Sequence, residues 1–130
     1  MKQVLPVKRV LIIEHDSLHR DLLREWLEAC GACPVWPPVG LEAAGDIDAI
    51  LVDVACQQQA HEILASWRRA YPRAAIVLAS GRFTAGDTGN DAMALRLGAT
   101  RILAKPFTRA ELCTALGLGG ESASGDQCHR

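Results

Sequence analysis

Three short runs of apolar residues constrain the fold of this chain more than any other feature. They occupy residues 9–13, 48–53 and 74–79, and between their ends no polar side chain interrupts them. Strands without alternation of apolar and polar residues are typical of parallel sheets, which helices cover on both faces. The runs therefore predict the central strands of a buried parallel sheet.

Segments with helical features separate these runs. Leucine and tryptophan side chains recur at helical spacing between Leu18 and Leu27, after a start that either Ser17 or Asp16 could cap. Further helices are expected at about 58–70, 91–97 and 108–116, and about one helical turn at 41–44. Short strands are expected at 33–36, where prolines favour a sheet edge, and at 101–104. The predicted fold class is α/β, a five-stranded doubly wound parallel sheet with flavodoxin-like topology.

Length and charge narrow the class of protein. The 130 residues suffice for one domain, expected at 8–117, followed by a disordered tail at 118–130. With 14 basic and 15 acidic residues and no basic run, neither nucleic acid nor a membrane surface is an expected partner. The chain begins without the pattern of a signal peptide and holds no bilayer-spanning apolar run, so a cytoplasmic location is predicted.

The five cysteines are interpreted as free thiols. Cys30 and Cys33 form a C-x-x-C, but they stand where a helix is expected to end, whereas reactive pairs usually stand where a helix starts. A reducing cytosol would also keep them unpaired. They are therefore expected to act as small apolar side chains.

Polar groups gather where the predicted strands end. In an open parallel sheet, ligands bind beyond the carboxyl ends of the strands. The polar residues at these ends are Glu14, His15, Asp16, Asp53, Ser80 and Lys105. Carboxylates can hold a divalent metal, while a hydroxyl and an ammonium can contact phosphoryl oxygens, so the set suits phosphoryl transfer to a carboxylate. The simpler alternative is that Asp53 caps the next helix and the others are ordinary strand-end residues.

The order of these groups resembles the receiver domain of two-component response regulators, over roughly residues 8–116. The shared features are acids after the first strand, an Asp after the third, Ser-Gly after the fourth and Lys-Pro-Phe after the fifth. The resemblance implies that Asp53 is the phosphoryl acceptor and that Ser80 and Lys105 assist it. It also implies a cis peptide bond between Lys105 and Pro106.

The resemblance further implies a Mg²⁺ site formed by Glu14 and Asp53, with His15 or Asp16 left open as an additional ligand. His15 stands where the family usually has a second acid. Because imidazole is a poor ligand for Mg²⁺, binding is expected to be weak, and Mn²⁺ should be tolerated better. Ile102 takes the place of the family's usual aromatic switch residue and has no ring to reorient.

Two functions follow as hypotheses. The first is a stand-alone receiver, not an enzyme, that is phosphorylated by a sensor histidine kinase or a phosphotransfer protein. It would signal through contact with an unknown target protein, and a homodimer is compatible with this hypothesis. The second is a degenerate receiver-like scaffold that binds a partner without phosphorylation. A flavodoxin-like enzyme is disfavoured, because no Gly-rich phosphate loop follows the first strand.

Overall fold

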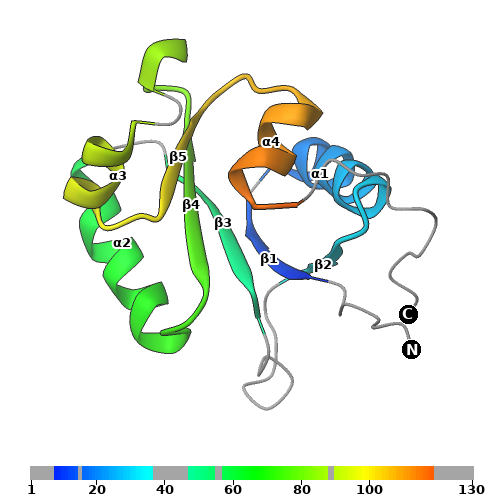
Figure 1. The fold of residues 1–130 in the computed structure, drawn as a ribbon, viewed down its shortest axis with the longest axis horizontal. Coiled ribbons are helices and arrows are strands. Elements are labelled where there is room, and N and C mark those ends of the chain that lie inside the picture. Colours follow the sequence, from blue (N-terminus) through cyan, green and yellow to red (C-terminus); the bar gives the residue numbers. More distant parts are fainter. Residues whose placement is uncertain (1–7, 15, 37–46, 55–56, 88–89, 119–130) are drawn as a thin grey trace, which may run out of the picture.

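The computed structural model describes residues 8–14, 16–36, 47–54, 57–87 and 90–118. Its strands are β1 (Arg9–Ile13), β2 (Cys33–Val35), β3 (Ala49–Asp53), β4 (Ala75–Ser80) and β5 (Arg101–Ala104). They form a five-stranded sheet in the order β2-β1-β3-β4-β5, and every pairing is parallel (Figure 1). The predicted doubly wound sheet is confirmed, with the proline-bearing strand β2 at one edge.

Helices cover both faces of the sheet (Figure 1). The helices are α1 (Ser17–Ala29), α2 (Gln57–Ala70), α3 (Asp91–Leu97) and α4 (Arg109–Ala115), with a short 3₁₀ turn at Ala85–Asp87. One apolar cluster joins the sheet to α1 and α4 through Leu23, Leu27, Leu112 and Ala115. The other joins it to α2 and α3 through Ala60, Leu64 and Ala94, with Trp67 and Leu97 packed against it. Apolar side chains on both faces explain why the central strands carry no polar residue between their ends.

Helix ends follow local capping chemistry. Asp16, rather than Ser17, caps α1, because its carboxylate accepts a hydrogen bond from the backbone N–H of Leu18 at 3.0 Å. Thr108 caps α4 in a reciprocal capping box with Glu111. After α3 the chain reverses at Gly98, whose φ of 90° favours glycine. These residues therefore determine where α1 and α4 begin and where α3 ends.

Helix α1 offers a matched test of core packing. Leu27 is fully buried against the sheet, whereas Leu18 in the same helix is 76% exposed. Leu27→Ala should lower the free energy of unfolding by about 2–5 kcal/mol, because it removes buried methyl groups and leaves a cavity. Leu18→Ala should change it by no more than about 0.5 kcal/mol. Urea unfolding followed by circular dichroism measures both, and equal losses would contradict the packing of α1.

The cysteines correct the sequence-based expectation of free thiols. A disulfide joins Cys30, at the C-terminal end of α1, to Cys113 in α4, across 83 residues of sequence. Cys33 is also disulfide-bonded. The expectation was wrong because it weighed only the local position of the C-x-x-C. The fold brings α4 beside the end of α1, a proximity that spacing along the chain does not reveal.

Some predictions concern residues outside the described part of the chain. The helical turn at 41–44 and the placement of His15 belong to this group. So does the tail from 119 onward, whereas Leu118 packs against the α1–α4 side of the core and donates its N–H to the Cys113 carbonyl at 2.8 Å. Among the described helices, none is both long and apolar enough to cross a lipid bilayer.

Candidate functional site

The register of the sheet brings the candidate acids together. Ile13 of β1 pairs with Val52 of β3, so the next residues, Glu14 and Asp53, lie side by side where these strands end. Ser80 ends the neighbouring strand β4 and pairs with Ala104, the residue before Lys105. The sequence-based expectation that these strand ends share one edge is therefore confirmed.

Lys105 connects the two carboxylates. Its Nζ donates a hydrogen bond to Asp53 Oδ1 at 2.9 Å and lies 3.5 Å from Glu14 Oε1. The Glu14 side chain is only 6% exposed, whereas those of Asp53 and Lys105 remain partly open to solvent. One ammonium thus sits between two acids, and one of these acids is accessible from outside. This arrangement leaves Asp53 available to a reacting group while Lys105 holds it in place.

Ser80 lies at the same edge but is engaged differently. The residue is buried, and its hydroxyl oxygen accepts a hydrogen bond from the backbone N–H of Arg82 at 3.0 Å. Its carbonyl accepts the backbone N–H of Lys105 at 3.1 Å. Within the described residues Ser80 makes no direct hydrogen bond to Asp53. Its observed contacts position the backbone of Lys105 and the loop after β4.

The remaining candidates sit around Glu14. Asp16 is exposed, its carboxylate caps α1, and its backbone N–H donates to Glu14 Oε2 at 3.3 Å. This capping role competes with any role in binding a metal. Sequence reasoning missed His19, whose Nδ1 lies 3.8 Å from Glu14 Oε2. Its position in the first turn of a helix that starts at this edge is the signal that could have identified it.

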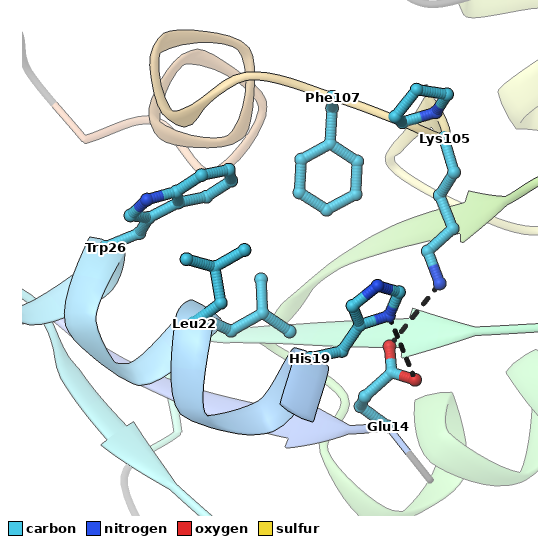
Figure 2. A pocket seen from close by; sticks show the side chains of 8 residues that line it. Glu14, His19, Leu22, Trp26, Lys105 and Phe107 are labelled. Carbon is cyan, nitrogen blue, oxygen red and sulfur yellow. Dashed lines mark hydrogen bonds and ion pairs between the residues drawn. The ribbon is translucent and has the colours of Figure 1, made fainter. Parts of the chain in front are cut away.

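A pocket of about 310 Å³ adjoins these groups (Figure 2). It lies between α1 and the segment that connects β5 to α4, with Leu22, Leu23, Trp26 and Phe107 as its apolar lining. Glu14, His19 and Lys105 form its polar end, as Figure 2 shows. The Trp26 and Phe107 rings meet edge to face, with centroids 6.2 Å apart. Sequence reasoning assigned Trp26 to packing and did not predict this pocket.

The acids at this edge suit a hard divalent cation. Lys105 Nζ lies 2.9 Å from Asp53 Oδ1 and 3.5 Å from Glu14 Oε1, so the two carboxylates face a common point. Mg²⁺ takes oxygen ligands and commonly retains several waters, so two carboxylates are a sufficient protein contribution. Across the residues that the structure describes, no group of three or more His, Cys, Asp or Glu side chains could hold a metal ion. The donor set therefore fits Mg²⁺ with a partly hydrated shell better than a fully protein-bound metal.

Comparison with known proteins supports the fold. No family model and no curated protein matches the sequence. In three dimensions the chain is similar to a response regulator receiver domain protein from Clostridium thermocellum. The TM-score is 0.67 at 21% identity, over 85% of this chain and 92% of the other.

Two further similar structures hold ligands. A response regulator from Burkholderia pseudomallei contains a phosphorylated aspartic acid, a calcium ion and citrate (TM-score 0.64, 23% identity, 84% of this chain and 66% of the other). The receiver domain of a sensor histidine kinase from Pseudomonas aeruginosa PAO1 has magnesium in its active-site cleft (TM-score 0.57, 25% identity, 85% and 95%). Together with the strand order and the acid-bearing edge, these similarities show that the chain has the receiver-domain fold of response regulators.

Proposed function

We propose that this chain is a cytoplasmic phosphoryl-accepting receiver. A histidine kinase or a phosphotransfer protein donates a phosphoryl group to Asp53, and the modified surface signals through contact with a target protein. The observation that carries the proposal is the 2.9 Å hydrogen bond from Lys105 to a partly exposed Asp53, with Glu14 on the adjoining strand end. A carboxylate used only to cap α2 would need neither of these neighbours.

Each side chain has a distinct task in this proposal. An Asp53 carboxylate oxygen attacks the phosphorus, and the bond between phosphorus and the donor nitrogen breaks. Lys105 transfers its hydrogen bond from Asp53 to a phosphoryl oxygen, which offsets the charge that arrives. Glu14 and Asp53 would hold a divalent metal, which would neutralise charge on phosphoryl oxygens when bound. The phosphorylated aspartic acid and the magnesium in similar structures support this assignment.

The alternative, a scaffold that is not phosphorylated, rests on two departures from the family pattern. His15 replaces an acid, and Ile102 is buried in the core, where it contacts the α2–α3 side of the sheet. A buried aliphatic side chain cannot alternate between inward and outward ring positions. A folded protein that gains no phosphoryl group would favour this alternative.

Metal removal tests the proposed chemistry. Incubation with acetyl phosphate and Mg²⁺ should add one phosphoryl group to the intact protein, as measured by mass spectrometry. Excess EDTA should slow this addition by at least about tenfold, because the phosphoryl charges then meet two carboxylates without a neutralising dication. Addition at the same rate in EDTA would contradict the metal role of Glu14 and Asp53. No addition under either condition would favour the scaffold.

His15→Asp should strengthen Mg²⁺ binding. The substitution supplies a hard oxygen ligand and one negative charge, and we expect a gain of about 1–3 kcal/mol in binding free energy, roughly 5- to 150-fold in affinity. Mn²⁺ should gain less, because it accepts imidazole more readily. The matched control is His61→Asp, which adds the same charge on the exposed surface of α2. Calorimetric titration measures these affinities, and equal Mg²⁺ affinity in wild type and His15→Asp would show that residue 15 does not face the metal.

A further inference from the structure

The disulfide between Cys30 and Cys113 lies in the seam between α1 and α4. Both helices pack on the same face of the sheet, as Figure 1 shows. Cys30 stands four residues, about one helical turn, after Trp26, so the two side chains belong to neighbouring positions on α1. Phe107, the partner of Trp26, lies two residues before the start of α4, and Lys105 two residues earlier still. The disulfide and the ring pair are therefore two contacts along one seam, which leads to the Lys105–Asp53 pair.

Helix α4 depends on such contacts for its position. It spans only Arg109–Ala115, and a helix of this length is not stable on its own in water. It is held by buried Leu112 and Ala115, by hydrogen bonds from Arg101 to the carbonyls of Thr114 and Ala115, and by the disulfide. Only the disulfide among these can be opened by a chemical reaction. Opening it should loosen α4 more than any other element.

The two sulfur-bearing residues differ in access. Cys113 is 8% exposed, whereas Cys30 at the end of α1 is partly open to solvent. A thiolate from outside can therefore approach the Cys30 side of the bond, with the Cys113 sulfur as leaving group. The cytoplasm, the location proposed above, is reducing. Disulfides that form there are commonly transient and redox-sensing rather than structural. This access suits a bond that opens and closes in the folded protein.

We propose that Cys30 and Cys113 form a reversible redox-modification site that controls how firmly α4 is held beside α1, and with it the Phe107 segment before α4 that lines the pocket opposite Trp26. A dithiol reductant opens it: one reductant thiolate attacks Cys30 Sγ, and the Cys113 thiolate leaves and takes up a proton. The second reductant thiol then displaces Cys30, which also becomes a thiol. Two electrons and two protons pass to the protein, and the reductant becomes a disulfide. Glutathione disulfide supplies the reverse oxidation, with two glutathione thiols as product.

The bond can be located by peptide mapping. Cleavage after glutamate leaves Cys113 alone in residues 112–121 and places Cys30 and Cys33 together in residues 29–42. In a Cys33→Ser variant, a link between these two peptides can therefore arise only from Cys30 and Cys113. The full chain oxidised with glutathione disulfide should yield the linked peptide, and dithiothreitol under native conditions should abolish it. A missing link after oxidation would overturn the proposal, as would a link that only denaturant makes reducible.

Hydrogen exchange tests the effect on α4. Reduction should speed amide exchange in residues 109–116 by about tenfold or more, while β3 and β4 remain protected. The double variant Cys30→Ser/Cys113→Ser should show the fast exchange with and without reductant, and Cys113→Ala serves if the serine variant folds poorly. Identical α4 exchange in oxidised and reduced wild type would overturn the proposal. These measurements involve no phosphoryl donor, so their outcome is independent of the function proposed for Asp53.

Discussion

Replacing Lys105 with alanine is expected to slow phosphorylation of Asp53 by about 10²–10³-fold. The structure places the Lys105 ammonium 2.9 Å from Asp53 and 3.5 Å from Glu14, in a position to meet the charge that a phosphoryl group brings. Removal of one positioned donor from a charge-stabilising site typically has an effect of this size. The rate of mass increase with acetyl phosphate and saturating Mg²⁺ measures it.

Two comparisons make the Lys105 experiment specific. Lys8→Ala removes the same charge at the residue before β1, where Lys8 Nζ donates to the Leu116 carbonyl, and should leave the rate within about twofold. Lys105→Arg keeps the charge but replaces the compact ammonium with a planar guanidinium group. We therefore expect a rate between those of wild type and Lys105→Ala. Mg²⁺ binding should persist in Lys105→Ala, which would show that the acids remain in place. A wild-type rate in Lys105→Ala would remove Lys105 from the proposed chemistry.

Much of the fold could be predicted because its strands are buried on both faces. Apolar runs at β1, β3 and β4 have few alternatives to a parallel sheet, and connections through helices then determine the order of strands. The sequence pattern could not decide which of two adjacent polar residues caps a helix. Asp16 and Ser17 are both good caps, and only the backbone geometry shows that Asp16 accepts the Leu18 N–H.

The candidate site also has features that the sequence could predict and features that it could not. The convergence of Glu14, Asp53 and Lys105 follows from a general property of parallel sheets, whose strands end at a common edge. The disulfide and the Trp26–Phe107 pocket depend instead on how α4 packs beside α1. No local pattern encodes this packing, since the partners are separated by about two thirds of the chain.

Asp53→Asn is expected to abolish phosphorylation by a small phosphoryl donor. The substitution preserves shape and a hydrogen-bond acceptor for Lys105, so the fold and the lysine position should survive. It removes the carboxylate oxygen that attacks phosphorus, and a neutral amide is not a comparable nucleophile. It also removes one negative charge from the metal site, which weakens the binding of a divalent cation.

Asp48→Asn is the matched control. Asp48 precedes the other end of β3, is exposed, and accepts the backbone N–H of Arg9 at 2.8 Å, a bond that an asparagine oxygen can also accept. Asp48→Asn therefore makes the same chemical change next to the opposite end of β3, away from Glu14 and Lys105. Circular dichroism of both variants should match that of wild type.

Intact-mass spectrometry of these three proteins, after incubation with acetyl phosphate and Mg²⁺, tests the central claim most directly. Wild type and Asp48→Asn should each gain the mass of one phosphoryl group, and Asp53→Asn should gain none. A phosphoryl group on Asp53→Asn, or its absence from folded wild type, would contradict Asp53 as the acceptor of this receiver.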